Sequence, residues 1–472
     1  MAENYKTNYK RALKARHIQL IALGGIVGSG FFLSTGAVIA NVGPSIFFAY
    51  IFGGLIVYLT MLCLGELTVA FPVTGSFINY STEFISPTFA CGVGWAYWIS
   101  WVACIPAECL AAGIIMQYFT GVNAYFWAVG FGLLVSWINF AKVGTFGEIG
   151  SWLAIIKVSA LIVFSITAVL IFFGVIHGTR PSEIIGTKYL LDQGGILPNG
   201  ITSVLAAMAL MLVNFQGMEI ISLAAGELLD PENMLPKAIK SISIKICLTY
   251  IIPILCLVVI FPYYKANITN SVFADALNFY GLKWAGIAIS LVTLISAVSC
   301  ASTGFYGIIR ALNCLATNGM APEQLTKLNN NYVPQNAGVV TLLAIWLVLG
   351  VSYFFSESTL YIALLLVSGF TGSIVWISIC LAQIKFRKKL RLSEISDSVL
   401  KYKTPGSPYT GIIAIFLISG CLMFLVFSTD KIYKLSFCIG LSALFVPMIL
   451  YRFFGSPKNN NLYLIKYLKK QN

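Results

Sequence analysis

The sequence predicts an all-α membrane protein that crosses the bilayer many times, and three observations support this fold class. Hydrophobic residues make up 58% of the 472 residues and charged residues only 10%, whereas a soluble chain carries about 25% charged residues. Apolar runs of about 20 residues, enough for a helix to cross a hydrocarbon core of about 30 Å, recur along the chain. The alternating pattern of a membrane β-barrel is absent, so these runs must be helices in lipid.

Twelve apolar runs are predicted to span the membrane, and together they use more than half of the chain. Their approximate ranges are 18–40, 45–66, 93–119, 124–140, 150–174, 200–224, 241–262, 283–312, 336–355, 358–384, 410–428 and 433–453. The residues before the first run are polar and basic, without the short apolar core and small-residue cleavage site of a signal peptide. The first span is therefore predicted to be retained.

Basic residues predict the orientation of these spans. Of the 30 lysines and arginines, 17 lie in three clusters: Lys6, Lys10, Arg11, Lys14 and Arg16; Lys385, Arg387, Lys388, Lys389, Arg391, Lys401 and Lys403; and Arg452, Lys458, Lys466, Lys469 and Lys470. Cytoplasmic loops carry such an excess, and twelve spans place all three clusters on one side. Both termini are therefore predicted to be cytoplasmic, in a multi-pass protein of the inner or plasma membrane. The three clusters flank helices and account for much of the net charge of +13. The positive charge therefore does not indicate a nucleic-acid-binding face.

The predicted spans divide the chain into seven units. In order, they are a basic cytoplasmic N-terminus (1–17), a first repeat of five helices (18–174), an external loop (175–199), a second repeat of five helices (200–384), a basic cytoplasmic loop (385–409), two further helices (410–453) and a cytoplasmic tail (454–472). Because each repeat contains an odd number of spans, the second is predicted to be inverted relative to the first.

Glycine interrupts two of the spans, with four glycines in 24–30 of span 1 and one, Gly217, in 214–219 of span 6. Broken helices at corresponding positions of inverted repeats are typical of a transporter site near the bilayer midplane, where half-helix N-termini bind anionic groups. In the alternative interpretation, the glycines only allow close packing of helices. A dinucleotide-binding loop does not fit, because the glycines follow a basic arm rather than a strand and have the order G-x-x-G-x-G.

The predicted spans contain few of the side chains that enzymes use for catalysis. The 11 cysteines form no Cys-x-x-Cys pair and lie mostly inside apolar spans, where they are expected to act as small hydrophobic residues. The two histidines, His17 and His177, fall at a membrane interface and in an external loop. Neither a histidine-based metal site nor a catalytic triad can form in the bilayer, and no cofactor is predicted.

Charged residues at bilayer depth are costly and are candidates for function. Glu108 lies in span 3 without another nearby charge, and Glu219 lies next to the glycine of the span 6 interruption. A functional role is predicted for both: Glu219 as a gate or proton-sensitive group bonded by the unwound backbone. The alternative for Glu108 is a carboxyl group that is kept neutral or paired for structural reasons.

Lys157 is the only cation in the middle of span 5. A lysine can release its proton, whereas an arginine stays charged, so Lys157 is predicted to take part in proton exchange. In the alternative interpretation its side chain extends to the cytoplasmic interface, which lies about 10 Å away along the helix. Glu66 and Arg310, near cytoplasmic ends of spans, are predicted to be interface or loop anchors.

The chain also carries a series of short motifs around its predicted spans. They are Gly28-Ser29-Gly30; Gly65-Glu66-Leu67; Phe71-Pro72-Val73-Thr74-Gly75-Ser76-Phe77; Phe215-Gln216-Gly217-Met218-Glu219; Ala225-Gly226-Glu227; Asp230-Pro231; Pro236-Lys237-Ala238; Arg310; Gly319; Ala321-Pro322; and Val333-Pro334. With these motifs the sequence resembles the amino acid permeases of the amino acid–polyamine–organocation superfamily over essentially its whole length. The resemblance implies a five-plus-five inverted repeat with spans 11 and 12 appended.

The resemblance implies a substrate site at the two interruptions. The substrate carboxylate is expected on the amides from Ile26 to Gly30, and the α-amino group on backbone carbonyls near Gly24 and Phe215. These are the donors and acceptors that an unwound turn frees. Phe215 is similar to an aromatic lid over the bound amino acid. The expected substrate-binding residues are Gly24, Ile26, Gly28, Ser29, Gly30, Glu108, Phe215, Gly217 and Glu219.

The resemblance also implies the coupling ion and a substrate class. Lys157 matches a lysine of proton-coupled relatives that stands where sodium-coupled relatives bind the ion. The closest resemblance is to arginine and ornithine permeases, through 62–77, 84–87 and 197–201. Glu108 matches a position that faces the substrate side chain, where a carboxylate suits a cation, although neutral-amino-acid permeases carry Glu there too. The sequence departs from the family pattern at three positions, Pro106, Met218 and Leu228, the first of which is expected to kink span 3.

The sequence thus predicts a secondary transporter that imports cationic amino acids with protons by alternating access. A neutral or broad-range permease and an amino acid antiporter are alternatives within transport. An amino acid sensor is an alternative from another class, but it should carry a folded extension, and the predicted tails are short. A membrane-embedded enzyme would need a cluster of catalytic residues. The predicted partners are an amino acid, protons and the lipid bilayer, with no nucleic acid.

Overall fold

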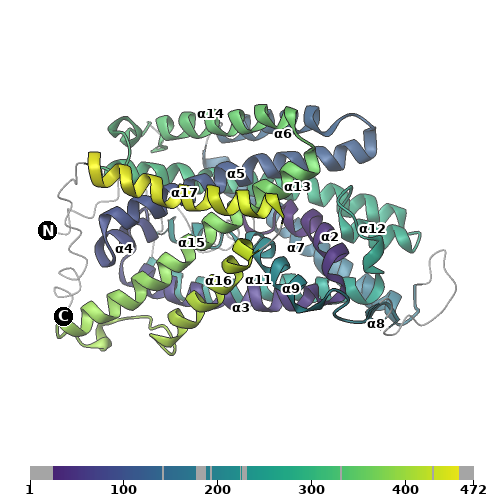
Figure 1. Ribbon diagram of the computed structural model, residues 1–472, viewed down its shortest axis with the longest axis horizontal. Coiled ribbons are helices and arrows are strands. Elements are labelled where there is room, and N and C mark those ends of the chain that lie inside the picture. The colour runs from purple at the N-terminus through teal and green to yellow at the C-terminus, as the bar shows by residue number, and fades with distance from the viewer. Residues whose placement is uncertain are drawn as a thin grey trace.

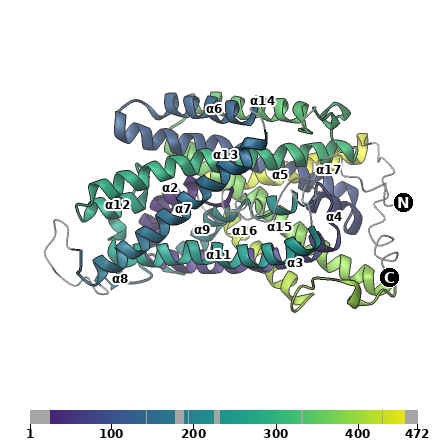
Figure 2. The same ribbon diagram turned by 180° about the vertical axis from the view of Figure 1, so that it is seen from behind.

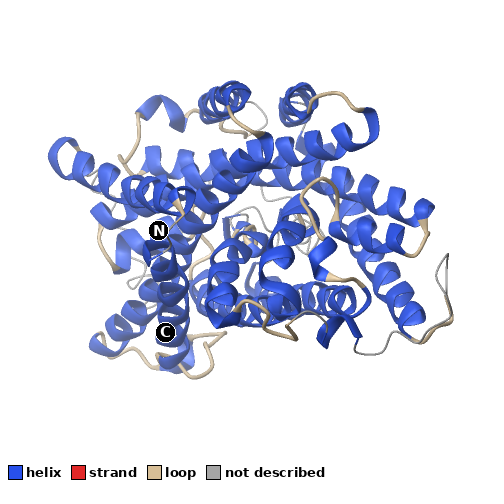
Figure 3. Cartoon of the chain, turned by 45° about the vertical axis from the view of Figure 1, so that its right-hand side comes forward, coloured by secondary structure: helices blue, strands red, loops and turns tan. Residues whose placement is uncertain are grey.

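The computed structural model describes residues 25–140, 143–176, 188–191, 194–223, 225, 231–329, 332–427 and 430–455. These residues form helices joined by loops, and no strand occurs among them (Figure 3). The all-α prediction is therefore confirmed over this part of the chain. Several features discussed above lie outside the described residues: the first basic cluster, His17, Gly24, His177, Gly226, Glu227, Leu228, Asp230 and most of the C-terminal tail.

The described helices follow the predicted spans closely. The longer ones are α2 (Ser29–Val42), α3 (Ile46–Ala70), α5 (Pro87–Thr120), α6 (Ala124–Phe140), α7 (Val143–Phe172), α9 (Gly200–Met211), α11 (Pro231–Ile260), α13 (Lys283–Thr317), α14 (Gln335–Val351), α15 (Glu357–Leu392), α16 (Tyr409–Phe427) and α17 (Lys431–Phe454). Short helices were not predicted: α4 (Phe77–Phe84), α8 (Lys188–Leu191), α10 (Ile220–Leu223) and α12 (Val272–Phe279). The 3-10 turns η2 (Gly43–Ser45) and η3 (Leu212–Phe215) extend α3 and α9.

Among the described residues, nine helical segments are long and apolar enough to cross a membrane. The first, Ser29–Ala70, contains two predicted spans joined through η2, and two other predicted spans coincide with shorter apolar helices, Ala124–Asn139 and Cys247–Ile260. The chain is therefore a multi-pass membrane protein. The number of twelve crossings stays a prediction, because length and hydropathy alone do not place a helix in the bilayer.

Helices α5 and α9 lie at the centre of the bundle. Of the 18 most apolar consecutive residues in α5, and likewise in Gly200–Leu223, 89% are buried. In the corresponding stretch of α17, only 17% of the residues are buried. Figures 1 and 2 show α6 beside α14 along one edge and α3 beside α11 along the opposite edge. Helices α8 and α12 lie at one end of the molecule, and α4 and the basic end of α15 lie at the other (Figure 1). The orientation of these two ends relative to the membrane stays a prediction.

Helix α5 begins and ends with residues suited to those positions. The Ser86 side chain accepts a hydrogen bond from Phe89 N, Pro87 occupies the first turn, and Gly121 ends the helix in a left-handed conformation. Pro106 lies inside the helix, which continues as one element over 34 residues. The proline therefore does not break the helix that carries Glu108 toward the centre of the protein.

Both predicted interruptions are present. Residues 27–28 separate a helical residue pair from α2, and residues 216–219 separate η3 from α10. Gly217 has φ +106°, and a Cβ on it would lie 3.0 Å from the backbone carbon and oxygen of Gly25. Only glycine fits this conformation without strain. The two interruptions thus meet each other, and their close approach is the physical reason for glycine at position 217.

A buried ion pair joins α3 to α15 at the basic end of the molecule. The Glu66 side chain is fully buried, and its two oxygens accept from Arg387 Nε at 2.6 Å and Nη2 at 3.0 Å. Thr404 N also donates to Glu66, and Arg387 Nη1 lies 2.8 Å from Asp397 Oδ2. Glu66 therefore anchors the loop that follows α15, in agreement with its expected role as an anchor.

Replacing Glu66 by glutamine should lower the stability of the fold by about 3 kcal/mol, because it removes the buried carboxylate of the pair and leaves Arg387 with only the half-exposed Asp397 as a charged partner. Thermal unfolding of the purified protein in detergent measures this loss. The matched control is Glu83→Gln, which breaks the 2.6 Å pair with the half-exposed Lys389 and should cost less than about 1 kcal/mol. Equal melting temperatures for the two variants would contradict the anchoring role.

Candidate functional site

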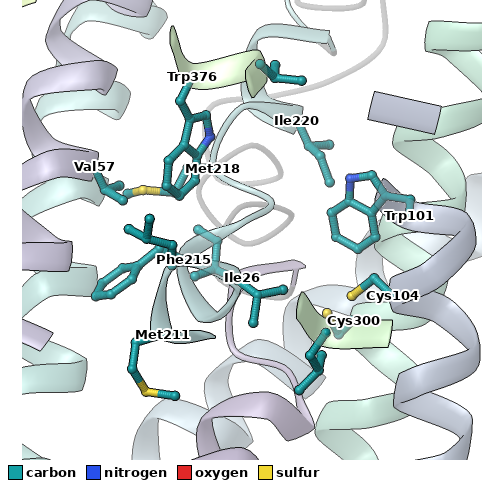
Figure 4. Packing of buried hydrophobic residues seen from close by; sticks show 14 of the residues in the cluster. Ile26, Val57, Trp101, Cys104, Met211, Phe215, Met218, Ile220, Cys300 and Trp376 are labelled. Atoms are coloured by element: carbon teal, nitrogen blue, oxygen red, sulfur yellow. The ribbon is translucent and has the colours of Figure 1, made fainter. Parts of the chain in front are cut away.

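A small cavity of about 10 Å³, room for about one water molecule, lies where the two interruptions meet. Its walls come from the first turn of α2, from η3 and from helices α5, α13 and α15. The lining residues are Ile26, Gly28, Gly30, Trp101, Cys104, Glu108, Val213, Asn214, Gln216, Cys300 and Leu365. Figure 4 shows part of this region, with Trp101 and Cys104 on one side and Ile26 and Phe215 on the other. This volume is far below that of a typical small-molecule site, so the helices around the cavity are closely packed in this structure.

The N-terminus of α2 binds a carboxylate of the protein itself. Glu108, which is 3% exposed, accepts a hydrogen bond from Ser29 N at 2.9 Å. A Cβ on Gly28 would lie 2.3 Å from Glu108 Oε1, so a larger residue at this position would displace the carboxylate. A helix N-terminus favours an anion through its free N–H groups and its dipole. The amide of Ser29 at the span 1 interruption is thus bonded to a carboxyl oxygen of the protein itself, and the binding of a substrate carboxylate there stays a prediction.

Lys157 reaches the same interruption from α7. Its fully buried ammonium group donates to Val27 O at 2.9 Å and to Ser296 O of α13 at 3.4 Å. It also lies within electrostatic range of the Glu108 carboxylate. The side chain is held inside the protein and does not extend to a membrane surface in this structure. A carboxylate and an ammonium group therefore face the same unwound turn from opposite helices.

Two further charged residues are buried without lining the cavity. Glu219 accepts from Gly217 N at 3.1 Å and from Trp376 Nε1 at 3.3 Å, which is the bonding by unwound backbone that the sequence predicts. Arg310 donates to Tyr306 O one turn earlier and stacks on the Tyr306 ring, 3.4 Å from its centroid. Glu219 thus fastens the span 6 interruption to α15, beside the cavity rather than in it.

Phe215, the predicted lid, is turned away from the cavity. Its ring packs against Tyr50 and Tyr250, with centroid distances of 6.0 and 5.0 Å, and against Gly53. Phe215 and Gly217 are absent from the cavity wall. A lid movement by Phe215 would require η3 to rotate from the position it has here. The expected carbonyl of Gly24 lies outside the described residues.

Sequence reasoning missed several lining residues. Trp101 and Cys104 lie on the same face of α5 as Glu108, at helical spacings of seven and four residues, and this spacing could have identified them. Asn214 and Gln216 are polar residues inside an apolar span, which is a comparable signal. Leu365 had no such signal, because a leucine in a membrane helix is indistinguishable by type from its lipid-facing neighbours.

Gln216 connects the span 6 interruption to α15. Its Nε2 donates to Ser368 O at 2.7 Å, and its Oε1 accepts from Ser368 Oγ at 2.9 Å. Ser100 Oγ of α5 lies 3.0 Å from the same carbonyl oxygen. This hydrogen-bonded network forms one wall of the cavity, and the polar atoms of Gln216 in that wall are already paired with Ser368.

The two interrupted helices of this multi-pass membrane bundle therefore meet at a small cavity, which Glu108 and the N-terminus of α2 border. The sequence profile of the family described as "Amino acid permease" matches residues 17–452. The chain belongs to the amino acid permease family, whose curated members found by comparison are transporters rather than enzymes.

Four similar proteins illustrate the relationship. The amino-acid permeases RocC and RocE of Bacillus subtilis (strain 168) are each 34% identical to this chain, over 91% and 94% of its length and over 92% and 94% of their own. The lysine-specific permease LysP of Escherichia coli (strain K12) is 32% identical over 86% of this chain and 85% of its own. A gamma-aminobutyric acid permease of the same Bacillus strain is equally similar, at 32% identity. Relatives at this level thus differ in the substrates that their names state.

Proposed function

We propose that this protein imports amino acids together with protons, and that cationic amino acids are its preferred substrates. Transport proceeds by alternating access around the interruptions of α2 and of η3–α10. The proposal includes twelve crossings, two inverted repeats of five helices, and cytoplasmic termini, so that the basic end of α15 faces the cytoplasm.

The observation that carries the proposal is the contact between Glu108 and Ser29 N at 2.9 Å. It identifies the α2 N-terminus as a place where a carboxylate binds inside the protein. An amino acid entering the cavity brings its own carboxylate to this N-terminus and competes with Glu108 for its amides. Lys157, bonded to the adjacent Val27 O, balances the negative charge and supplies an exchangeable proton.

The substrate class follows from the charge of the cavity wall and from the relatives. Of the described residues that line the cavity, Glu108 is the single acidic one, and none is basic. One of the similar proteins is named as a lysine-specific permease. A carboxylate released from Ser29 N by the substrate would be free to pair with a cationic side chain. A neutral-amino-acid permease remains the alternative, because the remaining wall is uncharged, and an antiporter is a second one.

The test is uptake into proteoliposomes of the purified protein. An inside-alkaline pH gradient should drive accumulation of labelled arginine, and a proton ionophore should abolish it. Unlabelled lysine and ornithine should compete at least tenfold better than leucine or proline. Accumulation that requires sodium would contradict proton coupling. Accumulation that occurs only against a preloaded amino acid would also contradict it and would favour the antiporter. Equal competition by leucine would contradict the cationic class.

A further inference from the structure

Helix α12 lies in the connection between α11 and α13, outside the apolar segments that can cross a membrane. It packs against α13, α2 and α11, at the end of the molecule opposite the basic end of α15 (Figure 1). Two glycines allow this close packing. A Cβ on Gly286 of α13 would lie 2.2 Å from Asn278 Oδ1 of α12, and a Cβ on Gly36 of α2 would lie 2.2 Å from Asn267 O, just before α12. The helix is thus seated on α2 and α13.

The buried face of α12 reaches the helix turn that follows the span 1 interruption. Phe273 is fully buried, and its ring centroid lies 5.2 Å from that of Phe31 and 5.6 Å from that of Phe32. Both of these phenylalanines belong to the first turn of α2, which begins at Ser29. The Phe164 ring of α7 also contacts Phe273, at 4.9 Å. A movement of α2 at the interruption therefore disturbs the packing of α12.

One carboxyl group is enclosed where α12 is seated. Asp275 Oδ2 is buried, and the described residues give it no hydrogen-bond partner. Its Oδ1 accepts a long hydrogen bond of 3.5 Å from Asn270 Nδ2, and the Ser290 hydroxyl lies 2.9 Å from Asn270 Oδ1 and orients that amide. An ionised group that is buried without a partner is costly, so the surroundings favour the neutral carboxyl group.

The elements around α12 do not supply a compensating cation. Helix α2 contains no titratable residue. Nearest to the contacts with α12 along the other elements, the titratable side chains are Lys157 of α7, Lys188 and Tyr189 of α8, Cys256 of α11, the three residues of η5 (Tyr263–Lys265), Tyr280 and Lys283 of α13. Among the described residues, none of these forms an ion pair or hydrogen bond with Asp275. Burial therefore raises the pKa of Asp275 from 3.8 to about 6.

We propose that Asp275 is a proton-binding site outside the cavity, and that its proton holds α12 on α2 and α13. The inference goes beyond the proposed function, because it concerns a residue that neither lines the cavity nor contacts Lys157. When α12 leaves its seat, the carboxyl group reaches water and ionises; when the helix returns, the carboxylate takes up a proton. Acid therefore favours the seated helix, which restrains α2 beside the interruption. This stabilisation is complete below about pH 4 and is lost as the pH rises through about 6.

The opening of α12 can be measured without any transport. Ala276 and Ala274, both fully buried in α12, are replaced singly by cysteine, and the rate of labelling by a water-soluble thiol reagent is followed from pH 5 to pH 8. Thr269→Cys, in the exposed loop before α12, corrects for the pH dependence of the thiol itself. Labelling of native cysteines such as the exposed Cys438 is subtracted. The corrected rate should rise about tenfold over this range, because that is how far a pKa of about 6 instead of 3.8 shifts the opening equilibrium.

Two further variants decide whether Asp275 causes this rise. In Asp275→Asn the corrected rate should stay constant with pH, because an amide does not titrate. Lys283→Gln is the control, since it removes the nearest cation of α13 and should keep the tenfold rise. A rise that persists in Asp275→Asn, a rise that is lost in Lys283→Gln, or a rate that is independent of pH without either change would each contradict the inference. Labelling reports on α12 even in a protein that transports nothing, so a failure of the proposed function would appear separately, in the uptake experiment.

Discussion

Replacing Lys157 by alanine should abolish uptake that is driven by an imposed pH gradient, with a loss of at least about 100-fold. The ammonium group bonds to Val27 O in the span 1 interruption and to Ser296 O in α13. Loss of its proton removes the positive charge beside Glu108 and one of the three N–H donors, which weakens the charge-assisted hydrogen bonds that hold the unwound turn. Protonation therefore changes how firmly α2 is tied to α13, which is the physical requirement for a coupling group. Alanine removes the titratable ammonium group, so Val27 O and Ser296 O both lose this hydrogen-bond donor.

The measurement needs two transport modes in the same proteoliposomes. Gradient-driven accumulation should disappear in Lys157→Ala, whereas exchange of labelled for unlabelled substrate at equal pH should persist, because exchange requires no net proton movement. Lys403→Ala is the matched control, since Lys403 is exposed in the loop after α15, and it should accumulate substrate as the wild type does. Undiminished gradient-driven uptake by Lys157→Ala would rule out its coupling role.

The positions of the interruptions could be predicted because their cause is local. A glycine such as Gly217, at φ +106° against the backbone of Gly25, leaves a direct trace in the sequence. Helix positions were predictable for a similar reason, since long runs of apolar residues indicate where the long helices form. The short helices α4 and α12 were missed because eight residues carry too little of a periodic pattern.

The contacts of the site could be predicted only in part. Glu108 and Lys157 were identified as exceptional because charge is rare in lipid, but that rarity does not specify partners. The bond from Ser29 N to Glu108 joins residues 79 positions apart, and it depends on how α5 is rotated against α2. The orientation of Phe215 depends likewise on the packing of Tyr50 and Tyr250 around it. Such rotations follow from the whole bundle and leave no local pattern.

Replacing Glu108 by glutamine should lower kcat/KM for arginine by about 100-fold. Glutamine keeps the size of the side chain and an oxygen that can accept from Ser29 N, but it removes the charge. A cationic side chain then loses the single acidic residue among the described residues of the cavity wall, and charge-assisted hydrogen bonds contribute about 1.5–3 kcal/mol. Uptake of labelled arginine by Glu108→Gln and by the control Glu83→Gln measures the effect.

The same variant distinguishes two roles for the carboxylate. If Glu108 selects the side chain, arginine uptake should fall while leucine, as a weak competitor in the wild type, should become the better competitor in Glu108→Gln. If Glu108 instead acts only through Ser29 N and Lys157, the two amino acids should be affected equally, because every substrate presents the same carboxylate to α2. Glu108→Asp adds a second distinction: it keeps the charge but shortens the side chain that bonds Ser29 N at 2.9 Å. If Glu108→Asp still prefers arginine, the charge of the carboxylate determines selectivity. If the same variant transports more slowly, the contact with α2 determines the transport rate.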